Sequence, residues 1–276
     1  MNSEDIIVAL AVKYDGDWDK IMQALKRDRC RRMNLLQEEV EEIDTVEELE
    51  EYLKIAKSAS YKYTTILSSD YPELLKTLYK PPFALFYLGD LSLAKDCGKN
   101  VSVVGSRDCS QYGINMTRSI VSEIANQYNI VSGLAAGIDT VAHQTAIDVG
   151  GKTIAVLGGG IEYCYPSSNR MLYEEIKRFH LVISEYPGNH VPDFYKFPRR
   201  NRIIAALSRG TIVTEAYDKS GSLYTVGYAL DTNRLVLCVP YPADAHSECN
   251  RLIAGGAYLI ENGKDALEIL EKEIHL

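Results

Sequence analysis

The sequence predicts a doubly wound α/β protein with a small N-terminal all-helical domain. Short apolar runs alternate with helix-length segments from Asn100 onward, whereas the first 60 residues show only helical spacing. Glycine-rich turns follow several of the apolar runs, as in Rossmann-like folds. We therefore expect a helical accessory domain at 1–60, a connector at 61–99 and a Rossmann-like domain at 100–276.

The first 60 residues carry apolar side chains at the spacing of short helices. Ile6, Leu10, Ile21 and Leu25 are examples from the first two helices. Thr45, followed by Glu48, forms a capping box ahead of a third helix. The stretch that follows is rich in turn signals and predicts a connector without chemistry: Tyr71-Pro72, Pro81-Pro82 and Gly89-Asp90.

Six apolar runs predict the strands of a mostly parallel sheet that is covered on both faces: 101–105, 130–133, 153–158, 181–186, 211–216 and 235–239. In such sheets ligands bind in the crevice beyond the carboxyl ends of the strands. The residues that directly follow each run are therefore the candidates for a site.

Composition sets the cellular context of the chain. It has 276 residues and 46% hydrophobic content, without a signal peptide or an apolar run of membrane-spanning length. We expect a cytoplasmic protein that does not enter a membrane. Its six cysteines lack C-x-x-C spacing and its five histidines form no ligand pattern. We therefore expect no metal and no cofactor.

The net charge of −8 hides a strong asymmetry. Only acids occur among the charged residues from 38 to 51: Glu38, Glu39, Glu41, Glu42, Asp44, Glu47, Glu48, Glu50 and Glu51. Only bases occur from 196 to 209: Lys196, Arg199, Arg200, Arg202 and Arg209. The second run predicts either a local basic face for phosphates or an ordinary solvated helix face.

Glycine-rich loops follow three of the predicted strands, at 105–107, 132–139 and 158–160. Small residues between a strand and a helix N-terminus let main-chain amides approach an anion, and the helix dipole favours negative charge there. Glycines also serve tight turns, so one loop is weak evidence. Three loops on one crevice edge favour a phosphate cradle.

Common nucleotide and hydrolase motifs are absent from the sequence. It contains no G-x-G-x-x-G after the first run, no ATPase phosphate loop and no G-x-S-x-G elbow. Asp139 and His143 have helical spacing and could form an acid/base pair, although capping and packing are the favoured roles. We therefore expect a protein that is not an enzyme.

The motifs then resemble a known family in one continuous order. They are Val103 to Arg107, Ser132 to Asp139, Ala142-His143, Lys152 to Gly158, Phe197-Pro198, Arg200 to Ile204, Glu215-Ala216 and Ser220 to Leu223. This pattern is similar to that of the DNA-processing protein A family, also called Smf, over residues 64–262.

The resemblance implies an extended Rossmann fold that forms a homodimer and binds single-stranded DNA without sequence preference. It also implies protection of incoming DNA and loading of the RecA recombinase during natural transformation, without catalysis. The N-terminal helices resemble the sterile-alpha-motif-like domain of other members. A basic residue often follows the Tyr-Pro pair in relatives, and Ser167 stands there, with Arg170 the nearest cation.

We predict that DNA contacts Ser106, Arg107, Ser132, Gly133, Leu134, Ala135, Gly137, Asn169, Arg170, Arg200 and Arg202. Arg200 and Arg202 could instead pair with Glu215 or Glu185, and the two serines could instead cap helices. The candidates for base stacking are Tyr165, Phe194, Tyr195 and Phe197.

Two other functions remain as alternatives. Related folds include nucleotide phosphoribohydrolases, whose P-G-G-x-G-T-x-x-E signature is not matched here, since Gly160 is followed by Ile161-Glu162. The same glycine loops would also serve a nucleotide-sensing module.

Overall fold

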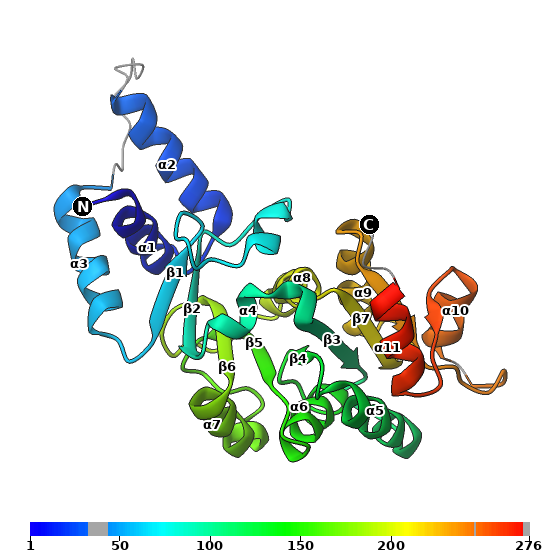
Figure 1. Ribbon diagram of the computed structural model, residues 1–276. Helices are drawn as coiled ribbons and strands as arrows, with labels where there is room; N and C mark the ends of the chain where they lie inside the picture. Colours follow the sequence, from blue (N-terminus) through cyan, green and yellow to red (C-terminus); the bar gives the residue numbers. More distant parts are fainter. Residues whose placement is uncertain (33–43, 246, 273–276) are drawn as a thin grey trace.

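The fold is built on one nine-stranded sheet (Figure 1). The computed structural model describes residues 1–32, 44–245 and 247–272. The strand order is β1-β2-β6-β5-β4-β3-β7-β8-β9. The strands are β1 (Lys62–Thr65), β2 (Ala84–Gly89), β3 (Asn100–Gly105), β4 (Asn129–Ser132), β5 (Thr153–Gly160), β6 (Leu181–Tyr186), β7 (Gly210–Glu215), β8 (Leu235–Cys238) and β9 (Tyr258–Leu259).

The sheet is doubly wound about its central strand β3. From β3 the chain adds β4, β5 and β6 in succession on one side, all parallel. It then returns to place β7 on the other side of β3, followed by β8 and β9, again parallel. The direction of winding therefore reverses between β3 and β7, and a crevice opens at their carboxyl ends.

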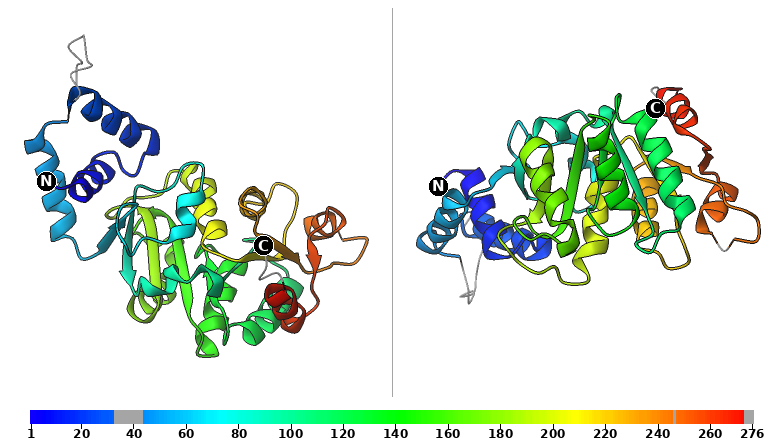
Figure 2. Two further views of the ribbon diagram at one scale, coloured as in Figure 1. Left: turned by 45° about the horizontal axis from the view of Figure 1, so that its top comes forward. Right: turned by 90° about the horizontal axis from the view of Figure 1, so that it is seen from below.

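Helices cover both faces of the sheet, because neighbouring residues of the central strands bury their side chains in different clusters. Val103 packs with α5 (Gln111–Ile124) and α6 (Ile138–Asp148), whereas Val104 packs with α8 (Lys196–Ala206) on the other face. Figure 2 shows the two helical layers. The remaining helices of this part are α4 (Ser92–Lys95), α7 (Arg170–Phe179), α9 (Ser222–Asp231), α10 (Glu248–Ala254), α11 (Gly263–Lys272) and the short η1 (Glu73–Thr77), η2 (Cys97–Lys99) and η3 (Ser167–Asn169).

Three helices precede the sheet, as the sequence predicts: α1 (Ser3–Lys13), α2 (Trp18–Arg32) and α3 (Val46–Ser58). Asn2 caps α1 and Thr45 caps α3 by accepting from the amide of Glu48. The helices pack beside β1 and β2, where the rings of Trp18 and Phe83 stack at 5.5 Å. The acids at 38, 39, 41 and 42 lie outside the described residues.

The six predicted strands are confirmed, with ends shifted by at most two residues. The segment 61–99 is more than a connector, because β2 pairs antiparallel with β6 and β1 pairs antiparallel with β2, which extends the sheet. Pro82 precedes β2, and the segment reaches the sheet only at its edge, where strands tolerate flanking prolines. The division into domains stays a prediction. None of the helices in the described ranges has the length and apolarity needed to cross a membrane.

Candidate functional site

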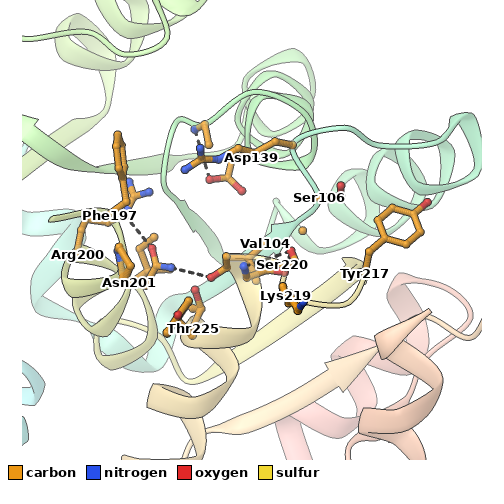
Figure 3. Close-up of a pocket in the computed structure, with 18 of the residues that line it drawn as sticks. Val104, Ser106, Asp139, Phe197, Arg200, Asn201, Tyr217, Lys219, Ser220 and Thr225 are labelled. Atoms are coloured by element: carbon orange, nitrogen blue, oxygen red, sulfur yellow. Dashed lines mark hydrogen bonds between the residues drawn. The ribbon is translucent and has the colours of Figure 1, made fainter. Parts of the chain in front are cut away.

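A cavity of about 510 Å³ lies at the carboxyl ends of β3 and β7, where the winding reverses (Figure 3). The loop after β3 forms one wall, the loop after β7 forms the opposite wall, and the first turns of α8 close one side. Its lining includes Ser106, Arg107, Asp108, Ala135, Asp139, Phe194, Phe197, Arg200, Asn201, Tyr217, Asp218, Lys219, Ser220, Gly221, Ser222, Tyr224 and Thr225. We call it the switch-point cavity. Its position is the one that topology predicts for a ligand.

Arg107 is the exposed cation on the β3 side of the cavity. Its guanidinium carbon lies 5.2 Å from the ring centroid of Phe197, within cation–π range. The Phe197 ring in turn lies 5.6 Å from the ring of Tyr165. Arg107 takes part in none of the ion pairs formed among the described residues, so its charge is available to a ligand.

The glycine-rich loop after β4 turns its amides toward a carboxylate of the protein itself. Asp139 Oδ2 accepts from the amide of Gly133 at 3.1 Å and from that of Ala135 at 3.4 Å. The carboxyl group is buried, and burial raises its pKa. This arrangement differs from the predicted phosphate cradle at 133–137, because Asp139 already occupies these two donors.

The backbone conformation of the same loop requires a glycine at position 137. Its φ is +79°, and a Cβ there would lie 2.3 Å from the carbonyl oxygen of Ser106. Leu134 also has a positive φ of +56° and is fully buried. These two residues bring the loops after β3 and β4 together, and neither offers a side chain to a ligand.

Arg200 is buried behind the cavity, with 4% of its surface exposed. Its Nη1 donates to the carbonyl oxygens of Gly133, at 2.6 Å, and of Val156, and its Nε donates to Asn201 at 3.0 Å. Burial lowers its pKa to about 10; the charge of Arg107 acts in the same direction and that of Asp139 opposes it. Arg200 thus holds α8 to the end of β4 and the middle of β5.

The opposite wall supplies Lys219, which is not among the contact residues predicted from the sequence. Lys219 is exposed, has a φ of +60° and lines the cavity just before the N-terminus of α9. Asn201 donates to the carbonyl oxygen of Gly221 at 3.0 Å and so ties this loop to α8. The sequence feature that could have identified Lys219 is its position after a predicted strand, beside the Ser220-Gly221-Ser222 turn.

Other predicted contact residues support the fold. The hydroxyls of Ser106 and Ser132 donate to main-chain carbonyls of Asp108 and Val103, so neither serine caps a helix through its side chain. Asn169 is buried and donates to Leu134 O at 3.0 Å and Thr140 Oγ1 at 2.7 Å.

The basic run at 196–209 does not form a basic face, because Lys196, Arg200 and Arg202 are all at least 95% buried. Arg202 forms a buried ion pair with Glu185 at 2.6 Å, which is the alternative to a phosphate contact stated for it above. The predicted contact residue Arg170 is exposed on α7 and pairs with Glu174 at 2.8 Å.

Asp139 and His143 do not form an acid/base pair with each other. The Thr153 hydroxyl donates to Ile130 O, so it accepts from Nδ1 of His143 at 2.6 Å. Burial lowers the pKa of His143 to about 3, so the ring is neutral. Asp139 therefore orders the loop after β4, and His143 is a buried packing residue bonded to Thr153; neither caps a helix. In the described ranges no cluster of three metal-ligating side chains occurs.

Fold and site define a Rossmann-like α/β protein with an open ligand cavity at its topological switch point. Residues 62–271 match the family described as DNA recombination-mediator protein A, and the chain belongs to that family. It is 41% identical to DNA processing protein DprA of Streptococcus pneumoniae over 244 residues, which cover 88% of this chain and 84% of that protein.

Two solved structures share this architecture. The X-ray structure of DprA from Streptococcus pneumoniae superimposes with a TM-score of 0.80 at 34% identity, covering 97% of this chain and 98% of that one. DprA from Helicobacter pylori gives a TM-score of 0.70 at 29% identity, covering 78% of this chain and 99% of that one. The latter structure was determined to describe a single-stranded DNA binding mode.

Proposed function

We propose that this chain binds single-stranded DNA in the switch-point cavity without sequence preference. The observation that carries the proposal is the contact between the exposed Arg107 and the Phe197 ring at the open cavity. Arginine suits a phosphodiester because its planar fork matches the phosphate oxygens and keeps its charge. An aromatic ring stacks on any unpaired base, and Phe194, with 87% of its surface exposed, offers a second one.

Lys219 extends the proposed contact to the opposite wall. Arg107 and Lys219 together provide two cations on the two walls. Asp108 and Asp218 lie in the same lining and limit the net positive charge. The rings of Tyr217 and Tyr224 lie on that wall as well. Few phosphate contacts and several rings favour binding that depends on base stacking, and hence single strands over duplex.

Binding is favoured over catalysis by the state of the two buried carboxylates nearest the cavity. Asp139 accepts two main-chain amides, as described above. Glu215 accepts from the amide and hydroxyl of Ser110 and from the Tyr217 hydroxyl, which raises the pKa of Tyr217 to about 12. Both oxygens of Glu215 and Oδ2 of Asp139 thus hold donors of the neighbouring loops, which favours a structural role for these carboxylates over that of a general base.

The wider role that we propose is that of a recombination mediator which protects incoming DNA and loads RecA during natural transformation. The family description supports mediation of recombination. We also propose a homodimer through the C-terminal half, because Tyr258 and Leu259 expose apolar surface on the edge strand β9. A cytoplasmic location fits such a role. Nucleation of RecA on single-stranded DNA in the presence of the protein tests the loading step.

The direct test is a titration of labelled single-stranded and duplex oligonucleotides at several salt concentrations. Arg107→Ala removes a charge-assisted hydrogen bond of about 1.5–3 kcal/mol, so affinity for the single strand should fall tenfold to a hundredfold. The slope of log affinity against log salt should become shallower by about 0.7, because one fewer counterion is released.

Arg118→Ala is the matched control, since Arg118 is an exposed arginine of α5 outside the cavity lining. It should bind like the unmodified protein. Unchanged single-strand affinity in Arg107→Ala, with a native circular dichroism spectrum, would exclude the proposed site.

A further inference from the structure

The first turn of α8 presents different side chains to two different parts of the protein. Phe197 and Arg200, three residues apart, face the switch-point cavity. Lys196 and Arg199, also three residues apart, contact the turn that joins α1 to α2. The N-terminal helices therefore touch the same helical turn that supplies the proposed stacking ring.

The contact between that turn and the sheet is closely fitted. Asp15 and Gly16 both have positive φ, +47° and +65°. The carbonyl oxygen of Gly16 accepts from Arg199 Nη2 at 3.4 Å. A Cβ on Gly16 would lie 2.5 Å from the main-chain oxygen of Glu185 at the end of β6. The turn thus docks on a site that has no room for a larger residue.

Lys196 is the charged centre of this contact. It is 4% exposed, its ammonium lies 4.3 Å from the ring centroid of Tyr186, and it forms an ion pair with Asp15. Asp193, at 3.7 Å, is its second carboxylate partner. A buried ammonium needs such partners, because desolvation makes an unpaired buried charge very costly. Asp193 precedes Phe194, so the same ammonium joins the N-terminal turn to the loop that carries an exposed aromatic residue.

We propose that Asp15 and Lys196 are positioning residues for the DNA site. The α1–α2 turn fixes the Lys196 ammonium, and Lys196 fixes the start of α8 and the loop before it, which together place Phe197 and Phe194 at the cavity. Neither Asp15 nor Lys196 lines the cavity, so their effect on DNA is indirect. This inference rests on the proposed function. It gives the N-terminal helices a part in DNA affinity although their acidic surface does not favour contact with phosphates.

The test compares Asp15→Asn, Lys196→Met and the double variant with the full chain in single-strand titrations. Asparagine tolerates the positive φ at position 15, so Asp15→Asn removes charge with little backbone strain. Each single variant should bind roughly three- to thirtyfold more weakly, the range of indirect coupling between neighbouring elements. The double variant should lose no more than Lys196→Met alone, because both substitutions break one interaction. The salt slope should stay unchanged, since no phosphate contact is lost.

Asp19→Asn is the control, because the Asp19–Lys80 ion pair at 2.6 Å also joins the N-terminal helices to the rest of the chain but includes neither Lys196 nor another residue of α8. It should leave affinity unchanged. Emission of Trp18, the single tryptophan, checks that the helices of each variant remain docked.

Native affinity in both Asp15→Asn and Lys196→Met, while Arg107→Ala still weakens binding, would overturn this inference and leave the proposed function standing. A shallower salt slope in Lys196→Met would also overturn it, because Lys196 would then contact phosphate directly. If Arg107→Ala itself binds normally, the proposed site fails.

Discussion

Replacing Arg200 by methionine tests whether this arginine stabilises the fold or binds a ligand. Methionine keeps most of the apolar stem but removes every donor. The carbonyl oxygens of Gly133 and Val156 then lose the partner that now joins α8 to β4 and β5. Asp139, whose buried carboxyl group is favourably coupled to the Arg200 charge, loses its neighbouring cation.

The magnitude follows from the burial of all these groups. A buried acceptor left without its partner costs about 1–3 kcal/mol, and two acceptors are affected. The buried carboxyl group of Asp139 also loses the favourable influence of a nearby positive charge, which adds to this cost. Summed over the two acceptors, we expect Arg200→Met to lower the free energy of unfolding by about 3–5 kcal/mol. Urea denaturation followed by far-ultraviolet circular dichroism measures this change.

Asp139→Asn provides the matched second variant. Its amide oxygen can still accept from Gly133 and Ala135, but it carries no charge. Added to Arg200→Met, it should restore part of the lost stability, because no unpaired carboxylate remains buried. A loss below about 1 kcal/mol in Arg200→Met would refute the reasoning, since surface substitutions away from special features have effects of that small size. Arg200 would then be free to serve a ligand.

Two other outcomes are expected. Burial lowers the pKa of His143 from 6.5 to about 3. As the pH falls below 6.5, the unfolded chain therefore binds more protons than the folded one, and the free energy of unfolding decreases. The loss between pH 7 and pH 5 should be about 2 kcal/mol smaller in His143→Gln than in the unmodified protein, measured by urea denaturation; equal losses contradict this. Light scattering at micromolar concentration should give a dimer mass, and Leu259→Glu a monomer; a monomeric unmodified protein contradicts the proposed interface.

The strands of the parallel sheet were predictable because central strands are buried on both faces and become nearly continuous apolar runs. β6 was predicted to the residue and β8 to within one. β1 and β2 were missed, because β1 is only four residues long and their pairing depends on the edge of β6, which lies far along the chain. The turn signals at Pro81-Pro82 also favoured a loop over a strand next to the apolar run 83–88.

The site was predictable in position but only partly in its residues. The alternation of apolar runs and helices placed the candidate site at the carboxyl ends of the strands, and this led to Arg107. That β7 lies beside β3 is seen only in the structure. Burial of Arg200, Arg202 and Lys196 did not follow, because their partners come from other elements. Asp15, for example, is 181 positions away from Lys196 in the sequence. Composition shows how many charges a segment has, but not which of them the fold will bury.

The buried Asp139 also bears on the choice between a free nucleotide and a DNA strand as ligand. A terminal phosphate of a free nucleotide carries nearly two charges and is bound best by several converging amides at a helix N-terminus. Here Asp139 takes the amides of Gly133 and Ala135, so such a phosphate would meet a carboxyl group where it needs donors. A phosphodiester carries one charge and can be bound from outside by a single arginine, while rings hold the bases. The filled amide loop beside the open contact of Arg107 and Phe197 therefore favours the strand over the free nucleotide.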